Sequence, residues 1–253
     1  MLNKIVPSLE AAVAGVADGS TLLIGGFGAS GVPTELLQAL LETGARELTV
    51  VNNNAGNGEP GLSQLIRAGR VRKVICSFAR SSNPKKPNAA AFGEWYAAGR
   101  IELEVVPQGT LAERLRAAGA GIGPFFTPTA YGTRLAEGKE TRSINGRGYV
   151  LEDPLPGDVA FVKAQCGDSA GNLTYRYASR NFGPVMCMAA RLAVVQVDEI
   201  VPLGTLAPEH VMTPGIFVQR IVECQCQLKP YRASAWRRSS PPTSRRHPTS
   251  TWA

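Results

Sequence analysis

Apolar residues in the first half of the chain alternate between short continuous runs and segments with helical spacing. Residues 21–24 form an apolar run that leads into a glycine-rich stretch, after which leucines recur at the spacing of one helix face over residues 36–41. This alternation continues to about residue 118 and predicts an α/β fold with a mostly parallel, open sheet and flanking helices. The predicted strands are residues 21–24, 48–52, 71–77 and 101–106, and the predicted helices include residues 9–16, 36–41, 62–66, 92–96 and 111–115.

Residues with strong capping preferences mark the expected helix ends. Ser8 is a typical N-cap, and Pro33 suits the first turn of a helix because its missing N–H has no partner to lose there. Gly44 is a natural C-terminal stop. Thr110, with Glu113 three residues later, matches a capping box, so Thr110 is the expected N-cap of the helix that follows the fourth strand.

The second half of the chain is richer in strand signals. Asn145-Gly146 lies between two extended arms, which is the strongest short signal for a β-hairpin. Residues 119–128 have a loop-like composition. Further strands are predicted at residues 159–163, 173–176, 192–197 and 216–222, which gives one mixed α/β body with a more β-rich C-terminal half.

The composition changes after Val222. Residues 223–253 lack hydrophobic periodicity and are rich in Arg, Ser and Pro, which is typical of a disordered segment. We therefore divide the chain into a folded domain, residues 1–222, and a basic tail, residues 223–253. The tail is open to three interpretations: a solvated extension, a basic arm for an acidic partner, or the product of a shifted reading frame.

The net charge of +7 comes almost entirely from this tail. Six of the 27 basic residues, and none of the 20 acidic ones, follow residue 228, so residues 1–228 are nearly neutral. Because the positive and negative charges of residues 1–228 nearly cancel, a nucleic-acid partner is not expected. No apolar run reaches the ~18 residues of a membrane span, and residues 1–17 lack the charge pattern of a signal or transit peptide. We expect a cytoplasmic protein without a membrane partner.

The cysteines do not indicate a disulfide framework or a metal site. There are five of them, an odd number without paired spacing. A structural zinc ion needs four ligands, whereas Cys224 and Cys226 have no second pair nearby, and the chain holds only two histidines, His210 and His247. No metal is therefore expected.

The glycine-rich stretch after the first strand is the most informative local feature. A strand that feeds a glycine loop at a helix N-terminus presents free backbone N–H groups to an anion. Residues 26–31 match G-x-G-x-x-G, but this dinucleotide fingerprint also needs an acidic residue at the end of the second strand. Asn52, Asn53 and Asn54 stand there instead. An NAD-binding oxidoreductase remains an alternative on this motif.

A wider set of motifs resembles the class I coenzyme A transferases. Asp18-Gly19, Gly25-Gly26-Phe27 and Gly31-x-Pro33 are similar to the first signature of that family. The resemblance to its A subunits runs from residue 1 to about residue 222, in order and without large gaps. Within the family, the sequence of residues 54–59 most resembles members that use 3-oxoadipate, and less those that use acetoacetate. The remaining motifs are residues 53–59, 106–114, Tyr131-Gly132-Thr133, Gly171-Asn172-Leu173, Arg180-Asn181-Phe182 and Thr213-Pro214-Gly215-Ile216.

The resemblance implies transfer of CoA through a covalent enzyme intermediate. In this family the acyl-CoA thioester is attacked by a glutamate of the B subunit, an anhydride and then a glutamyl-CoA thioester form, and the acceptor carboxylate takes the CoA. That glutamate lies in a Ser-Glu-Asn-Gly motif, which this chain lacks. Glu59 matches the pattern of the A subunits and not that of the nucleophile. The resemblance therefore implies half of an active site, completed by a B subunit in a heterodimer or heterotetramer.

Three groups of residues are candidates for this half of the site. Gln108 follows the fourth strand, and the resemblance implies that its amide donates to the oxyanion formed when the thioester is attacked. Asn52, Asn53 and Asn54 are candidates for binding the acyl carboxylate, and the glycine loop for binding CoA. Structural roles in turns remain the alternatives for all three groups. The loop residues are Gly25, Gly26, Phe27, Gly28, Ala29, Ser30 and Gly31.

From the sequence we expect an A subunit that helps to move CoA from succinyl-CoA to 3-oxoadipate. Another acceptor, such as acetoacetate, is the first alternative, the NAD-binding oxidoreductase the second, and a non-enzymatic sugar-phosphate sensor the third. The expected chemistry needs no metal or redox cofactor, because a carboxylate nucleophile and oxyanion donors suffice. Arg80, Lys85 and Lys86 are further candidates for contact with the phosphates of CoA.

Overall fold

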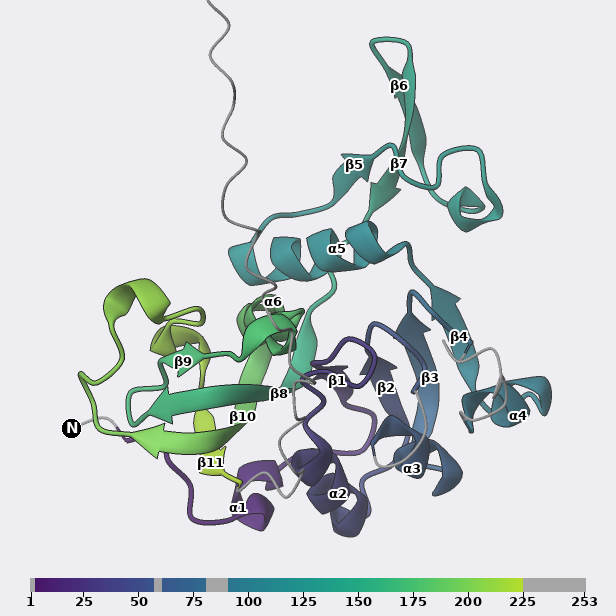
Figure 1. The fold of residues 1–253 in the computed structure, drawn as a ribbon. Coiled ribbons are helices and arrows are strands. Elements are labelled where there is room, and N and C mark those ends of the chain that lie inside the picture. The colour runs from purple at the N-terminus through teal and green to yellow at the C-terminus, as the bar shows by residue number, and fades with distance from the viewer. Residues whose placement is uncertain (1–2, 57–60, 81–90, 225–253) are drawn as a thin grey trace, which may run out of the picture.

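The structure is a computed structural model that describes residues 3–56, 61–80 and 91–224 (Figure 1). Within these residues the chain forms one large, mostly parallel sheet and one small antiparallel sheet. Helices lie on both faces of the large sheet (Figure 1). The α/β class and the parallel sheet predicted from the sequence are confirmed.

The large sheet has eight strands among the described residues, and seven of them follow the order β11-β10-β8-β1-β2-β3-β4. Every neighbouring pair along this order is parallel. The short strand β9 pairs antiparallel with β8. The strands are β1 (Thr21–Ile24), β2 (Leu48–Val51), β3 (Val71–Cys76), β4 (Glu102–Val105), β8 (Gly157–Asp168), β9 (Leu173–Thr174), β10 (Ala190–Val201) and β11 (Arg220–Glu223).

Two hydrophobic cores lie on the two faces of this sheet. Successive residues of a strand point to opposite faces, so Leu22 and Ile24 of β1 join one core while Leu23 joins the other. Helices α1 to α4 cover the first core and α5 and α6 the second (Figure 1). Because both faces are buried, β1 and β2 are apolar almost throughout. The helices are α1 (Leu9–Val13), α2 (Thr34–Thr43), α3 (Leu62–Arg67), α4 (Phe92–Ala97), α5 (Gln108–Ala120) and α6 (Gly183–Ala189).

Element boundaries in the first half follow the predicted signals closely. The four predicted strands are β1 to β4, each within one residue at either end. Ser8 caps α1 by accepting a hydrogen bond from Ala11 N at 3.2 Å. Gly44 ends α2 in the left-handed conformation. Pro33 is the N-cap of α2, one position before the helical turn in which it was expected.

The small sheet confirms the hairpin predicted at Asn145-Gly146. Ile144 pairs with Arg147 across a two-residue turn. Asn145 and Gly146 both have positive φ, 51° and 77°, as a type I′ turn requires. Strands β5 to β11 all follow residue 124, so the second half is richer in strands, as predicted. The strands of the small sheet, in the order β5-β7-β6, are β5 (Phe125–Thr127), β7 (Arg147–Glu152) and β6 (Thr141–Ile144).

Several predicted boundaries are wrong: α1 ends at Val13 and not at residue 16, and β8 and β10 extend beyond the predicted residues 159–163 and 192–197. Helix α5 begins at Gln108 with Pro107 as N-cap, so Thr110 lies inside the first turn and no capping box forms there. The predicted loop at 119–128 contains the end of α5 and all of β5. The last strand starts at Arg220, because Ile216 is 77% exposed in a 3-10 turn. The 3-10 turns are η1 (Arg134–Ala136), η2 (Tyr177–Arg180), η3 (Pro208–His210) and η4 (Gly215–Phe217).

The outer edge of β11 is covered by the N-terminal segment. Val6 N donates to Ile221 O at 2.8 Å, and Ile221 N donates to Lys4 O at 2.8 Å. Residues 4–6 therefore continue the parallel pairing of the sheet by one short segment. Past β11, Cys224 N still donates to Val197 O at 2.8 Å. The rest of the predicted tail lies outside the described residues.

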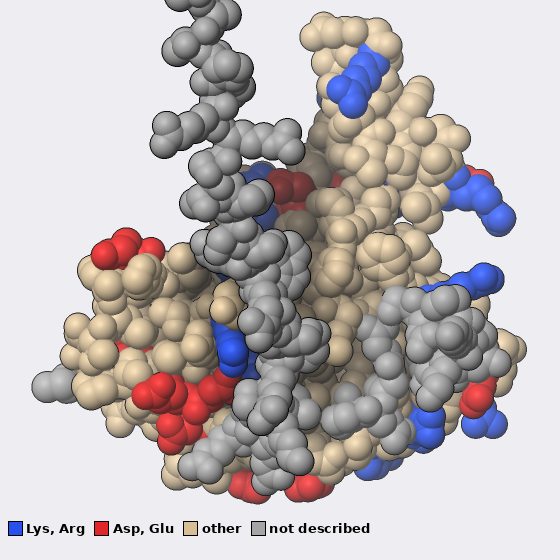
Figure 2. Space-filling model, in the orientation of Figure 1, with Lys and Arg blue, Asp and Glu red and all other residues tan. Residues whose placement is uncertain are grey.

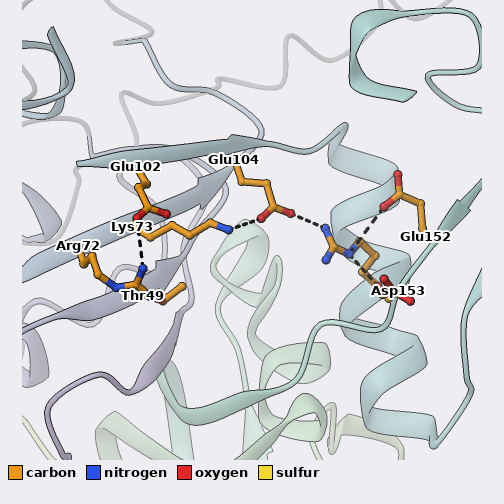
Figure 3. Close-up of polar contacts among 8 residues, drawn as sticks. Thr49, Arg72, Lys73, Glu102, Glu104, Glu152 and Asp153 are labelled. Carbon is orange, nitrogen blue, oxygen red and sulfur yellow. Dashed lines mark hydrogen bonds and ion pairs between the residues drawn. The ribbon is translucent and has the colours of Figure 1, made fainter. Parts of the chain in front are cut away.

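A chain of ion pairs joins the small sheet to the body (Figure 3). Glu104 of β4 lies 2.6 Å from Lys73 Nζ of β3 and 2.8 Å from Arg114 Nη1 of α5. Arg114 also faces Glu152 of β7 at 3.9 Å, and Glu152 is 2% exposed and pairs with Lys139 at 2.6 Å. Helix α5 is thereby fixed between the edge of the large sheet and the small sheet.

Charged side chains of both signs share the molecular surface. On the face shown in Figure 2, Lys and Arg side chains are interspersed with Asp and Glu and do not gather into one basic surface. In the part of the chain that the structure describes, no helix is long and apolar enough to cross a membrane.

Candidate active site

Strands β1 to β4 are adjacent and parallel, so their carboxyl ends lie at one edge of the large sheet. The glycine loop follows β1, Asn52 to Asn54 follow β2, and Gln108 follows β4 at the start of α5. Open α/β sheets bind their ligands outside this edge. The fold therefore places all three groups of predicted site residues where a ligand is expected.

Asn52 holds the ends of β1 and β2 together. It is 5% exposed, and its Nδ2 donates to the carbonyl oxygen of Ile24 at 2.7 Å, immediately before the glycine loop. Its Oδ1 accepts a hydrogen bond from Asn54 N at 2.9 Å. Asn54 Oδ1 in turn accepts one from Gly56 N at 3.0 Å. These contacts shape the turn after β2, and the predicted binding of a carboxylate by Asn52 and Asn54 stays a prediction.

Asn53 and Gln108 are in direct side-chain contact. Gln108 Nε2 donates to Asn53 Oδ1 at 2.6 Å. The backbone carbonyl of Asn53 also accepts hydrogen bonds from Ser77 N and Phe78 N, at 3.2 and 3.1 Å. Asn53 is 3% exposed and tied to the ends of both β2 and β3. It is therefore a rigid support for the more exposed Gln108.

The local sequence explains why Gln108 lies at this point. Val106 N donates to Cys76 O at 3.0 Å and so extends the pairing of β3 and β4. Pro107, with φ −54° and ψ 138°, then turns the chain into α5, whose first residue is Gln108. The amide nitrogen of Gln108 carries two hydrogens, and Asn53 takes one of them. The other can reach a ligand oxygen beside the positive end of the helix dipole, which suits a developing oxyanion.

The glycine loop folds into a small turn. Phe27 N donates to Ser30 O and Ser30 N donates to Phe27 O, both at 3.0 Å, so Gly28 and Ala29 form a two-residue tip. Phe27 is 50% exposed, and so, at 51%, is Phe78 after β3. The loop therefore brings an exposed aromatic side chain to the same edge as Gln108. Asn52, bonded to the residue before the loop, connects it to the Asn53–Gln108 pair.

Asn181 is a residue whose relation to the site the sequence did not reveal. Its Oδ1 accepts a hydrogen bond from Gly26 N at 3.0 Å, and its Nδ2 donates to Ser30 O at 3.1 Å. These partners lie 155 and 151 positions away. In the sequence, only the Arg180-Asn181-Phe182 motif drew attention to Asn181. The motif does not indicate which residues the Asn181 side chain contacts.

The structure describes only two of the five other sequence candidates. Glu59, Lys85 and Lys86 lie outside the described residues. Arg80 is exposed after β3, and His210 is exposed in η3. In the three described ranges, no group of three or more His, Cys, Asp or Glu residues is arranged to hold a metal ion.

Two buried cysteines are not suited to nucleophilic attack. Cys76 ends β3 near the site, and burial raises the pKa of its thiol to about 11. Burial also raises the pKa of Cys187 in α6 to about 12. The attacking form of cysteine is the thiolate. Both thiols therefore stay protonated and unreactive near neutral pH.

Comparison with known proteins identifies the family. The profile described as coenzyme A transferase matches residues 6–224, which is nearly all of the described body. The chain belongs to the coenzyme A transferase family. This membership confirms the resemblance seen in the sequence, and neither the NAD-binding oxidoreductase nor the sugar-phosphate sensor is supported.

Curated members of the coenzyme A transferase family align over most of the chain. The A subunit of the 3-oxoadipate CoA-transferase of Pseudomonas putida is 61% identical over 88% of this chain and 94% of that protein. The protein of the same name from Acinetobacter baylyi is 52% identical over 89% of this chain and 96% of that one. The A subunit of a succinyl-CoA:3-ketoacid coenzyme A transferase of Xanthomonas campestris is 50% identical over 84% and 86%.

Solved structures in the comparison share the fold. An acyl-CoA transferase of Escherichia coli O157:H7, in a thioester complex with CoA, superposes with a TM-score of 0.75 at 21% identity. The superposition covers 88% of this chain and 47% of that one, so this chain spans about half the length of the E. coli protein. The decarboxylase AibA/AibB gives a TM-score of 0.75 at 26% identity, over 88% of this chain and 84% of that one.

Proposed function

We propose that this chain is the A subunit of a heteromeric CoA-transferase that moves CoA from succinyl-CoA to 3-oxoadipate. The observation that carries the proposal is the 61% identity to the A subunit of a 3-oxoadipate CoA-transferase over 94% of that protein. The relative named for 3-ketoacids is 50% identical. The higher identity favours 3-oxoadipate over acetoacetate as the acceptor.

In the proposed reaction this chain contributes hydrogen-bond donors, and the partner contributes the nucleophile. Gln108 and Asn53 are neutral amides, which orient and donate but do not attack a thioester. The nearby thiol of Cys76 is protonated. Following the family resemblance, we therefore assign the nucleophile to a glutamate of a B subunit.

The reaction begins when that glutamate attacks the thioester carbonyl of succinyl-CoA. The tetrahedral oxyanion collapses to a succinyl-glutamyl anhydride and releases the CoA thiolate. The thiolate then attacks the glutamyl carbonyl, which frees succinate and leaves glutamyl-CoA. The carboxylate of 3-oxoadipate repeats the two steps in reverse order and leaves as 3-oxoadipyl-CoA. Each step passes through an oxyanion, and Gln108 Nε2 is the proposed donor to it.

The other candidate residues keep the roles expected from the sequence. The glycine loop, Gly25 to Gly31, is proposed as one wall of the CoA site, with the exposed ring of Phe27 available to pack on the ligand. Among the three asparagines, Asn53 has its amide oxygen engaged by Gln108, which leaves its amide nitrogen for an acyl carboxylate.

The proposal needs no resident metal or redox cofactor, and it includes a cytoplasmic setting and a heterodimeric or heterotetrameric assembly. Mass measurement of the purified complex with its B subunit distinguishes the two assemblies. A complex that forms only with an added metal ion would contradict the cofactor part of the proposal.

The decisive experiment compares the chain alone with the chain and its B subunit. CoA transfer from succinyl-CoA to 3-oxoadipate is measured by the appearance of 3-oxoadipyl-CoA. We expect activity only from the pair. Activity of the isolated chain would contradict the divided site, and no activity of a well-formed complex would contradict the reaction.

The acceptor is tested in the same assay. The ratio of kcat/KM for 3-oxoadipate to that for acetoacetate is expected to exceed about tenfold, the discrimination available from one additional ionic contact. A ratio below one would move the assignment to a 3-ketoacid such as acetoacetate.

A further inference from the structure

The Arg180-Asn181-Phe182 motif has no part in the reaction proposed above, yet its central side chain is among the most heavily hydrogen-bonded in the described chain. Asn181 Oδ1 accepts from two backbone N–H groups, Gly26 N at 3.0 Å and Phe182 N at 2.7 Å. One of these donors belongs to the glycine loop, and the other to the N-cap residue of α6.

The amide nitrogen of Asn181 makes the complementary contacts. Nδ2 lies within hydrogen-bond distance of three carbonyl oxygens: Ser30 at 3.1 Å, Ala178 at 3.0 Å and Ser179 at 3.1 Å. Two of these belong to the turn that contains η2, and Ser30 belongs to the glycine loop. A single side chain therefore satisfies backbone groups on both sides of the loop tip and ties them to the segment before α6.

The backbone around this side chain is closely fitted. A methyl group on Gly31, whose φ is 72°, would lie 2.5 Å from Ser179 O and 2.9 Å from Asn181 Nδ2. Asn181 itself has a φ of 20°, which is rare for residues other than glycine. Strained backbone of this kind persists only where the surrounding contacts hold it, and it concentrates at ligand sites.

We propose that Asn181 is a positioning residue that clamps the glycine loop in the shape that receives the acyl-CoA substrate. It fixes Gly26 and Ser30, the two residues that flank the Phe27 to Ala29 segment, and so sets where the exposed Phe27 ring and the loop tip lie. This role rests on the proposed function, because the loop is a CoA wall only if the chain takes part in CoA transfer. Asn181 itself is not a catalytic residue.

The clamp makes a prediction that separates binding from chemistry. Asn181→Ala removes the side chain, and Asn181→Gly removes it while allowing the positive φ, so that at least one variant keeps the fold. In complex with the B subunit, both are expected to raise KM for succinyl-CoA about tenfold, the effect of losing one or two loop-holding hydrogen bonds, with kcat within about twofold.

A second variant disturbs the same contact from the opposite side. Gly31→Ala pushes a methyl group against Ser179 O and is expected to raise KM for succinyl-CoA in the same way. Gly19→Ala is its matched control: Gly19 has a similar φ of 77°, but nothing lies within 4 Å of the added methyl. Both variants place an alanine at a similar positive φ, so a KM that rises only in Gly31→Ala is not explained by left-handed backbone strain.

Asn172→Ala is the matched control for the asparagine. Asn172 also bonds through both ends of its amide, from Nδ2 to Asp168 Oδ2 at 2.9 Å and from Gly215 N to Oδ1 at 3.0 Å. None of these partners belongs to the glycine loop. Its loss is expected to lower the free energy of unfolding but to leave KM for succinyl-CoA unchanged.

Hydrogen exchange in the isolated chain tests the clamp without any assay of activity. The amide of Gly26 is expected to exchange at least about tenfold faster in Asn181→Ala than in the wild type, since its acceptor is lost. Unchanged exchange overturns the clamp. Faster exchange with an unchanged KM in an active complex overturns its role in CoA binding. If the wild-type pair shows no transferase activity, the proposed function fails while the exchange result still decides on the clamp.

Discussion

Gln108 depends on Asn53 for its orientation, so the two residues form one chemical unit at the carboxyl edge of the sheet. The contact between Nε2 and Oδ1, at 2.6 Å, turns the amide nitrogen of Gln108 toward Asn53. Asn53 is in turn fixed by the backbone of the segment after β3. An oxyanion donor is effective only when it is held in place before the reaction.

Loss of the proposed oxyanion donor should affect the chemical step. Gln108→Ala is expected to lower kcat of the complex with the B subunit by about 10²–10³-fold, the usual cost of removing such a donor. Steady-state kinetics with succinyl-CoA and 3-oxoadipate measure it. Gln38→Ala is the control, because Gln38 is exposed on α2 and hydrogen-bonds to Glu42. An unchanged kcat for Gln108→Ala would contradict the assigned role.

Loss of the Asn53 side chain should slow the reaction through its effect on the orientation of Gln108. Asn53→Ala is expected to lower kcat on the order of tenfold, because a misdirected amide loses part of one hydrogen bond to the oxyanion. The kcat of the double variant with Gln108→Ala should then be no lower than that of Gln108→Ala alone, since the two residues act as a unit in the chemical step; binding of the acyl carboxylate by Asn53 would change KM. Additive losses in the double variant would show that Asn53 acts independently of Gln108.

At the scale of elements, the start of α5 is not where the capping-box pattern in the sequence predicts it. Thr110 and Glu113 match a capping box, yet the N-cap of the helix is Pro107, three residues before Thr110. Thr110 is 2% exposed, and its hydroxyl has no hydrogen-bond partner among the residues that the structure describes. The residue therefore faces the core as part of the first turn, and the two residues before it are helical.

Thr110→Val distinguishes the two descriptions of this helix. Loss of an N-cap would lower the free energy of unfolding by about 1 kcal/mol. In the observed position the change removes only an unsatisfied buried hydroxyl, so we expect stability to be unchanged or to rise by up to ~1 kcal/mol. Urea unfolding of the isolated chain measures the free energy of unfolding. A decrease near ~1 kcal/mol would contradict the observed position of Thr110 and support its role as the N-cap.

Strands β1 and β2 could be predicted because they are buried almost throughout, on both faces of the sheet, and each ends at a glycine or asparagine turn. Such strands appear in the sequence as apolar runs of the right length. The small sheet was harder to predict, because β5 has three residues that are all only partly buried. The start of β11 was predicted too early because Ile216 is apolar and was counted in the strand, although its side chain is exposed in η4.

At the scale of the whole molecule, the sequence predicted where the candidate residues lie along the strands, but not how they contact one another. Gln108, the asparagines and the glycine loop each follow a predicted strand, and the family resemblance singled them out as candidates. Their mutual contacts depend on strand order and on side-chain direction, neither of which periodicity records. Asn181 shows this most clearly, since its loop partners lie more than 150 positions away.

Because of the ion pairs that Arg114 of α5 makes, the stability of the fold is expected to depend on pH in the acid range. Burial alone would raise the pKa of Glu104, but the hydrogen bonds and charges of Lys73 and Arg114 outweigh it and hold the pKa below its ordinary value of 4.5. A carboxylate with a depressed folded pKa contributes stability above its unfolded pKa, and that contribution is lost as the pH falls through the folded value. The loss is therefore expected below about pH 4.5.

Glu104→Gln should remove this contribution. At pH 7 we expect the free energy of unfolding to fall by about 1 kcal/mol, as for a partly exposed ion-pair network. The difference from the wild type should vanish as urea unfolding is repeated from pH 5 toward pH 3. Glu113→Gln is the control, since Glu113 pairs with Arg116 on the exposed side of α5. A difference that stays constant with pH would contradict the electrostatic explanation.

The pairing of residues 4–6 with β11 has a consequence for how the protein behaves in solution. An uncovered strand edge is a template on which another chain can add a strand. A version that lacks residues 1–6 keeps the site and nearly all of both cores, but leaves the backbone of Ile221 open on its outer side. We expect it to self-associate at concentrations where the full chain stays dispersed, which light scattering would detect. We therefore expect residues 4–6 to limit aggregation by covering the edge of a strand that lies more than 200 positions later in the sequence.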